Sequence, residues 1–278
     1  MATLTGSSIA STYTTLLKLT SAALGADASG KYIEDAAGTD SALSLSTTRV
    51  GIGTATPDYQ LELEQAGGGA ISFKTTDVAV IDGDVLGTIR FGADDESHTG
   101  LDTGAYIKVV ATDNWQTSLS NVDAPTMIQF HTQDDSGTDT LTAPSMVIGG
   151  DTQGVVGIGT SSPVGVLDVA ESGANADIVI MANYNANTGA ILDLRHSRHE
   201  TVGSHTALNA ADKIGQINFK GSDGNSWEIG ASIMALTEEG WDSDSTGTHM
   251  SFHTVDSGVD SQTLDERMRI DHNGNIGI

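Results

Sequence analysis

Cysteine is absent from this 278-residue chain, and aromatic residues and prolines are scarce. Without cysteine, the chain can form neither a disulfide nor a thiolate metal site. Aromatic residues make up 5% of the chain and hydrophobic residues 38%, which is thin material for large independent cores. We therefore expect slim modules that find part of their apolar cover in a neighbouring module or a second chain.

Positive charge is also scarce. The 12 lysines and arginines stand against 37 acidic residues, which gives a formal net charge of -25. Such a surface repels nucleic acid phosphates and anionic membranes, so we predict no nucleic-acid partner and no membrane partner. The acids are spread through turn-like segments, which favours exposed soluble loops over one acidic interaction surface.

Long apolar runs are missing as well. No stretch approaches the length of a membrane span, and residues 1–6 lack the basic start and apolar segment of a secretory signal. The apolar residues sit in short runs, such as 107–110 and 178–181, between Asp, Gly, Ser, Thr and Asn. This pattern is typical of many short strands joined by turns, so we predict a mainly β fold.

A five-residue phrase recurs along the chain. Residues 50–54 read VGIGT, the same letters return at 156–160, and the chain stops inside a third copy at 276–278. Each complete copy continues through a proline turn into a short alternating strand, at 61–63 and at 167–169. A repeated strand-and-turn phrase indicates consecutive modules.

Matching landmarks lie between the copies of the phrase. Trp241 follows Trp115 by 126 residues, and Phe252 follows Phe130 by 122. An ordered series whose offset changes smoothly is what divergent repeats with variable loops produce. We therefore predict an N-terminal segment at 1–48, a first β-rich module at 49–155 and a second at 156–278. Strands are predicted near 69–74, 85–92, 104–111, 126–132, 145–149, 177–182, 189–195, 213–220, 226–236, 249–254 and 267–271.

The N-terminal segment does not share the repeat. Its apolar residues are spaced roughly as one face of a short helix, which predicts helical structure there. The candidate docking residues on that face are Ile9, Tyr13, Leu16, Leu17 and Leu19. A helix that only caps the first module is the open alternative.

The glycines and prolines of the phrase are candidate structural residues of a repeat turn. They are Gly51, Gly53, Pro57, Gly157, Gly159 and Pro163. The phrase lacks the third glycine of a dinucleotide loop and the Gly-Lys-Ser/Thr ending of a nucleotide loop. The predicted role of these residues is therefore backbone geometry, because glycine permits tight turns and close chain approach.

Other clusters point to no chemistry. His196, His199 and His205, with Glu200, lack the His-Glu-x-x-His order of zinc proteases, and the aspartates at 82–84 and 134–139 do not fit calcium loops. No nucleophile elbow occurs. His131 and His253 recur at equivalent repeat positions, which favours equivalent structural sites over a catalytic pair. We predict no catalytic residue, no metal site and no cofactor.

Several segments resemble a known family. RVGIGTATPDYQLEL at 49–63 and VVGIGTSSPVGVLDV at 155–169 resemble the repeat phrase of bacteriophage tail fibres and related trimeric phage fibre proteins. RMRIDHNGNIGI at 267–278 resembles that family's lead into another copy. Residues 4–18, followed by ALSLSTTR at 42–49, resemble the virion-proximal start of marine phage fibres. The resemblance implies an intertwined homotrimer, anchored on the virion by its N-terminal part.

The predicted function is that of a structural phage tail fibre: a virion-proximal anchor and shaft that supports host attachment. The chain would then be located in the virion, as part of the tail or another external appendage. The partners would be phage tail, nozzle or neck proteins for the N-terminal segment and a host surface receptor for a distal part. A capsid or neck fibre or decoration protein, and a polysaccharide-degrading tailspike, are the alternatives. Because the chain stops inside a repeat, we expect a distal continuation.

Overall fold

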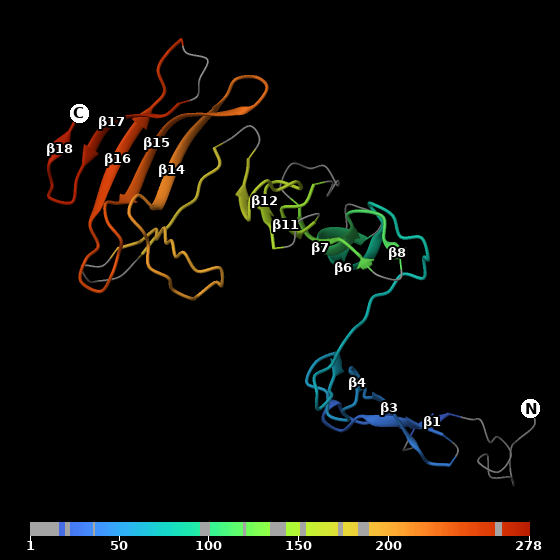
Figure 1. The fold of residues 1–278 in the computed structure, drawn as a ribbon. Helices are drawn as coiled ribbons and strands as arrows, with labels where there is room; N and C mark the ends of the chain where they lie inside the picture. The colour runs from blue at the N-terminus through green and yellow to red at the C-terminus, as the bar shows by residue number, and fades with distance from the viewer. Residues whose placement is uncertain are drawn as a thin grey trace, which may run out of the picture. The chain divides into compact units, whose positions relative to one another are not determined.

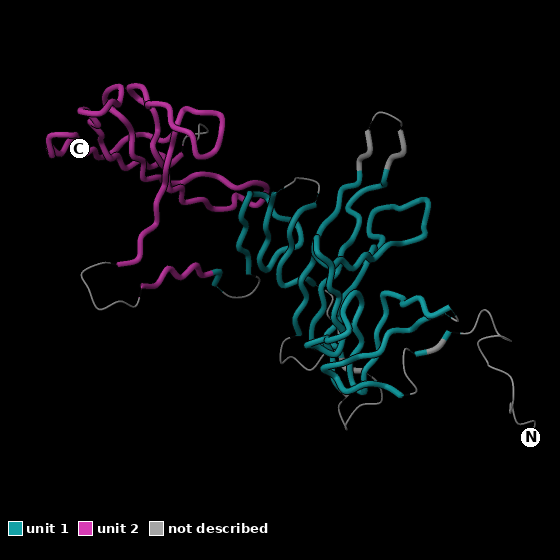
Figure 2. Tube along the Cα trace, turned by 90° about the horizontal axis from the view of Figure 1, so that it is seen from below, with its two compact units in different colours: residues 1–176 teal, residues 177–278 magenta. Residues whose placement is uncertain are grey.

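The computed structural model describes residues 17–19, 23–35, 37–94, 101–118, 121–133, 143–150, 154–171, 175–182, 189–258 and 263–278. Nearly all regular structure in these ranges is β, with a single 3₁₀ turn at Asp27–Ser29. No helix within them is long and apolar enough to cross a bilayer. The chain divides into two compact units, residues 1–176 and 177–278 (Figure 2).

The first unit contains two larger sheets. The first sheet has the order β1 (Lys18–Leu19), β2 (Lys31–Glu34), β3 (Asp40–Leu45), β4 (Val50–Ile52), β5 (Leu61–Leu63). Neighbouring strands in it are antiparallel, except that β4 and β5 are parallel. The first copy of the phrase therefore supplies β4, the turn after it, and β5.

The second sheet has six strands in the order β13-β12-β11-β10-β7-β6. Their bounds are β6 Val85–Asp94, β7 Leu101–Ala111, β10 Thr126–Thr132, β11 Met146–Gly149, β12 Val156–Ile158 and β13 Leu167–Val169. A separate hairpin, β8 (Gln116–Ser118) and β9 (Asn121–Asp123), lies between β7 and β10 in sequence. The second phrase again forms the last two strands, β12 and β13, which are parallel.

The third sheet belongs to the second unit and is a meander whose strands follow one another in sequence order (Figure 1). The strands are β14 (Lys213–Ser222), β15 (Trp227–Thr237), β16 (Thr248–Thr254), β17 (Asp265–Ile270) and β18 (Ile276–Gly277). Strand β18 pairs with β17 as β12 pairs with β11 and β4 with β3. The phrase thus has the same place in all three sheets. How the chain divides into repeat modules stays a prediction.

The second and third sheets each have one apolar and one polar face. Successive side chains of a strand point to opposite faces of the sheet. The register places apolar residues opposite apolar residues on one of these faces. The apolar face of the second sheet carries Ile89, Phe91, Ile107, Val109, Ile128, Phe130, Met146 and Ile148. The apolar face of the third carries Ile217, Phe219, Ile233, Ala235, Met250, Phe252, Met268 and Ile270.

The buried core is small. Buried hydrophobic residues are few among the described positions: Val80, Val110, Ala111, Val147, Val155 and Leu208. On the apolar faces, by contrast, Phe91 is 56% exposed and Phe219 is 54% exposed. The single chain therefore does not cover its own apolar faces.

The helix predicted in the N-terminal segment is wrong at its C-terminal end. Lys18–Leu19 form β1, where Leu19 pairs with Ile33 of β2, and Leu17 just before them is exposed. Pairing with a strand that is distant in sequence overrides the local helical spacing. Ile9, Tyr13 and Leu16 lie outside the described residues.

Eight of the predicted strands coincide with observed strands: β6, β7, β10, β11, β14, β15, β16 and β17. The strands predicted at 69–74, 177–182 and 189–195 are wrong for the single chain, because these residues make no β-bridge in it. Strand formation needs a partner, and the apolar runs in these segments have none among the described residues of their own chain.

Candidate assembly surface

The turn of the first phrase joins two parallel strands over only eight residues, 53–60, and this requires glycine at two positions. Gly53 has a φ of +83°, and a Cβ on it would lie 2.0 Å from the carbonyl oxygen of Glu64. A Cβ on Gly51 would lie 2.3 Å from the carbonyl oxygen of Thr54. Only a residue without a side chain allows this left-handed backbone and this close approach.

The turn of the second phrase has the same geometry. Gly159 has a φ of +72°, and its Cβ would lie 2.0 Å from the carbonyl oxygen of Ala170. A Cβ on Gly157 would lie 2.7 Å from the carbonyl oxygen of Thr160. The two copies of the phrase therefore form the same type of turn.

Side chains at fixed positions stabilise both turns. The threonine after the second glycine accepts a hydrogen bond from the amide two residues on, at 3.3 Å in the first turn and 3.2 Å in the second. The acidic residue in the middle of the strand that follows each turn accepts a hydrogen bond from the backbone amide just after the proline. The amide of Asp58 donates to Glu62 Oε2 at 2.5 Å, and that of Val164 donates to Asp168 Oδ2 at 3.0 Å. Pro57 is fully buried and Pro163 is half-buried.

Asp27 binds residues 46–48, which lie just before the first copy of the phrase. Its carboxylate accepts hydrogen bonds from Thr48 Oγ1 at 2.6 Å, from Ser46 Oγ at 2.8 Å and from the Thr48 amide at 3.1 Å. Arg49 Nε lies 3.7 Å away. The hydroxyl donors of Thr48 and Ser46 lower the pKa of Asp27 to about 2, because they stabilise its ionised form.

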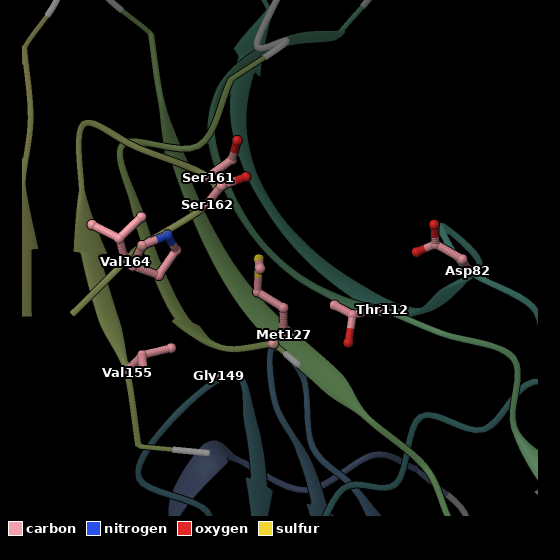
Figure 3. A pocket seen from close by; sticks show the side chains of 10 residues that line it. Asp82, Thr112, Met127, Gly149, Val155, Ser161, Ser162 and Val164 are labelled. Carbon is pink, nitrogen blue, oxygen red and sulfur yellow. The ribbon is translucent and has the colours of Figure 1, made fainter. Parts of the chain in front are cut away.

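A cavity of about 510 Å³ lies beside the second turn (Figure 3). Figure 3 shows Ser161, Ser162 and Val164 on one side of it and Thr112 and Asp82 on the other, with Met127 between them. Asp82 is the one titratable group among the described residues of this lining, and Figure 3 shows it apart from Ser161 and Ser162.

A second cavity, of about 580 Å³, opens on the polar face of the third sheet. Glu238, His249, His253 and Glu266 are among the residues that line it, and His249 Nδ1 lies 3.4 Å from Glu238 Oε1. Arg269 donates two hydrogen bonds of 2.8 Å to Glu266, and these lower the pKa of that carboxyl. Glu266 is consequently ionised at neutral pH.

The two repeated histidines lie on the polar faces. His131 is buried, stacks on Tyr106 at 4.2 Å between ring centroids, and has its Nε2 3.2 Å from Gln129 Oε1. His253 has its Nε2 2.9 Å from Ser251 Oγ. Both side chains are engaged within their own sheets at equivalent positions.

The other clusters singled out from the sequence have ordinary structural contacts. His196 Nδ1 lies 2.8 Å from the carbonyl oxygen of Lys213, and His199 Nδ1 accepts from the Thr201 amide. Asp84 Oδ2 accepts from the Ile81 amide, whereas residues 134–139 lie outside the described residues. No group of three His, Asp or Glu side chains in the described part of the chain is placed to hold a metal ion.

No protein-family model matches the sequence, and no curated protein is significantly similar to it. The similar solved structures include two of a phage tail fibre. The carboxy-terminal domain of the bacteriophage T5 L-shaped tail fibre aligns with a TM-score of 0.59 and 19% identity, over 77% of this chain and 88% of that chain. The fold of the present chain is therefore similar to that of a phage tail-fibre domain.

A second structure contains the T5 carboxy-terminal domain together with its intra-molecular chaperone domain. It aligns with a TM-score of 0.61 and 17% identity, over 77% of this chain and 60% of that chain. At such identity the likeness establishes the fold. The repeat turns and the uncovered apolar faces are the features of that fold on which a function can be argued.

Proposed function

We propose that this protein is a structural phage tail fibre that works as a homotrimer, with its β sheets as a shaft and its N-terminal segment as the virion anchor. The observation that carries the proposal is the pair of uncovered apolar faces on a fold similar to a phage tail-fibre domain. Three copies held together multiply the contacts of one fibre with a host surface.

The exposed area supports assembly. A folded globular chain of 28.6 kDa exposes about 11,000 Å², whereas this chain exposes 20501 Å². Large apolar side chains are among the exposed residues, including Ile89 at 45% and Ile217 at 46%. Large apolar faces of this kind mark protein interfaces, and burying them against further copies removes them from water.

Mass and location test the proposal. Sedimentation of the purified chain should give about 86 kDa, three times the 28.6 kDa of one copy. Gold-labelled antibodies against the chain should mark a tail appendage in electron micrographs of virions. A monomer at micromolar concentration would contradict the assembly, and label confined to the head would support a capsid or neck decoration protein.

The N-terminal segment is the proposed contact with phage tail, nozzle or neck proteins. Leu17 is 69% exposed at the start of the described chain, and Leu24 is 47% exposed. These side chains, with the undescribed Ile9, Tyr13 and Leu16, would supply apolar contacts to the virion. A host surface receptor is the proposed partner of a distal part of the assembled fibre.

The alternative of a polysaccharide-degrading tailspike has a direct test. The described strands are mainly antiparallel, with parallel pairing at β4–β5 and β12–β13, unlike a long parallel β-helix. We expect no oligosaccharide to be released when the protein is incubated with host surface polysaccharide. Released oligosaccharide that disappears in Glu238→Gln would locate an active site in the cavity lined by Glu238 and Glu266.

A further inference from the structure

Two extended segments, 69–74 and 189–195, lie in equivalent places before the first long strand of their sheets. Both begin with Gly-Ala-Ile, and one precedes β6 as the other precedes β14. Within the described ranges, neither segment makes a backbone-to-backbone hydrogen bond. Exposed strand-like backbone of this kind is a template for pairing with another chain. We call 69–74 and 189–195 the free segments.

The side chains of each free segment alternate between two sides. In the first, Ile71 and Phe73 alternate with Ser72 and Lys74. In the second, Leu192 and Leu194 lie on one side, and Ile191, Asp193 and Arg195 lie on the other. The Arg195 Nε to Asp193 Oδ2 hydrogen bond of 3.1 Å holds these two side chains together. Residues two apart in an extended chain share a face. The first free segment thus has one apolar and one polar side, as the sheets do, and the second has one apolar side and one mixed side.

Each free segment packs closely against a glycine on the apolar face of its own sheet. A Cβ on Gly87 of β6 would lie 2.7 Å from Cβ of Phe73, and one on Gly215 of β14 would lie 2.9 Å from Cβ of Leu194. The segment therefore crosses over the face of its own sheet at the β6 or β14 side. Its backbone is not added to that sheet's edge, so its hydrogen-bonding groups are available to a second copy.

The two edges of the second sheet differ. Strand β6 carries Arg90, a charge of the kind that protects an edge strand, whereas β13 at the other edge is short and exposes Leu167 to 61%. The ladder between β12 and β13 uses the carbonyl of Val166 and the amide of Ala170. The backbone groups of Leu167 and Val169 therefore face the open side.

We propose that the free segments are strands of the assembly. Residues 69–74 of one copy pair with β13 of the next copy, and 189–195 pair with the same side of the neighbouring third sheet, the β18 side. The inference rests on the proposed homotrimer. A closed ring of three copies joins unlike surfaces, so the β6 side of one sheet meets the β13 side of the next.

The side chains agree with this pairing. In this pairing Ile71 and Phe73 lie on the apolar face, beside Leu167 and Val169 of β13. Ser72 and Lys74 then lie on the side of Asp168, where a lysine and a carboxylate are complementary. A cross-strand apolar row and an opposite-charge pair are both stabilising arrangements in sheets.

Hydrogen exchange of the full chain, read by mass spectrometry, tests the pairing. Peptides covering 69–74 and 189–195 should exchange at least 100-fold more slowly than the rate for an unpaired chain. Exchange at the unpaired rate in a protein that sediments as a trimer would overturn the strand pairing and leave the trimer standing. A monomer would overturn both.

A cross-link tests which strand is the partner. Because the chain has no cysteine, a disulfide can form only between introduced residues. Co-expressed Ser72→Cys and Asp168→Cys chains should give disulfide-linked dimers on mild oxidation, and each variant alone should give none. As a matched control, Ser72→Cys is co-expressed with Val202→Cys, whose side chain is fully exposed in the second unit. Equal cross-linking in the control would refute the assignment of β13.

Discussion

At the scale of single residues, Asp27 makes a pH-dependent contribution. Its pKa of about 2 lies below its ordinary value of 3.8, because Thr48 and Ser46 donate to the carboxylate. A group with a lowered pKa stabilises the fold above its ordinary value and loses that effect as pH falls through the lowered one. Asp27→Asn should therefore lower the thermal midpoint at pH 7, and the difference from the unmodified protein should shrink as pH falls from about 4 to about 2 and vanish below that.

The exposed Asp40 of β3 gives the control for this experiment. Asp40→Asn removes the same charge without touching the hydroxyl and amide donors around Asp27. It should leave the midpoint at pH 7 nearly unchanged. If both variants lower the midpoint equally, net charge rather than the Asp27 hydrogen bonds is responsible.

Gly53 and Gly38 separate two roles of glycine within one sheet. Both have positive φ, +83° and +84°, but a Cβ on Gly38 meets nothing within 4 Å, whereas one on Gly53 meets the carbonyl oxygen of Glu64 at 2.0 Å. Gly38→Ala should cost about 1 kcal/mol from backbone strain alone. Gly53→Ala should cost about 3 kcal/mol, since overpacking adds to strain. Urea unfolding followed by circular dichroism measures both, and equal losses would show that the close contact is unimportant.

The structural role of the turn residues could be predicted from the sequence because the phrase is repeated. Two copies of a phrase with glycine, threonine, proline and an acid at fixed places point to backbone geometry, although not to which amide each side chain caps. The contacts of Asp27 could not be read in this way. Its partners lie 19 to 21 residues away and occur once in the described chain, so no local pattern marks them.

At the scale of elements, the two faces of a strand should respond oppositely to charge. Phe219 lies on the apolar face of β14, and its neighbour Asn218 points to the polar face. Phe219→Asp places a carboxylate in the proposed interface, where burial without a partner is costly. It should weaken self-association by on the order of 100-fold, about 2.8 kcal/mol.

Asn218→Asp supplies the matched control, since it introduces the same charge one residue away. It should sediment as the unmodified protein does. Sedimentation equilibrium over a range of concentrations measures both variants. Dissociation caused by Asn218→Asp, with Phe219→Asp still assembled, would mean that the polar face is the interface.

Alternation and length predicted the strands that pair within the chain, because their partners are the next strands in sequence or, for β7 and β10, are separated only by the β8–β9 hairpin. The free segments and 177–182 carry the same local pattern and remain unpaired, since a strand also depends on what lies beside it. Local spacing likewise suggested a helix before residue 20, where the observed pairing is between Leu19 and Ile33. Both differences arise from contacts that are not local in sequence.

At the scale of the whole molecule, the first sheet determines how the anchor can be tested. Deleting residues 1–48 would remove β1, β2 and β3 and leave β4 without the strand to which Val50 pairs through Leu45. Loss of function in that deletion would not separate anchoring from damage to the sheet. Deleting residues 1–16 removes most of the proposed docking residues and retains every described strand.

The shorter deletion should sediment as a trimer and fail to enter virions. Complementation of a phage that lacks the fibre, scored by antibody labelling of purified particles, measures incorporation. Removal of the β8–β9 hairpin, residues 116–123, is the control, because that hairpin is a separate two-stranded sheet. Its loss should leave incorporation unchanged. Normal incorporation of the 1–16 deletion would refute the anchoring role, and the exposed Leu17 and Leu24 would then require another explanation.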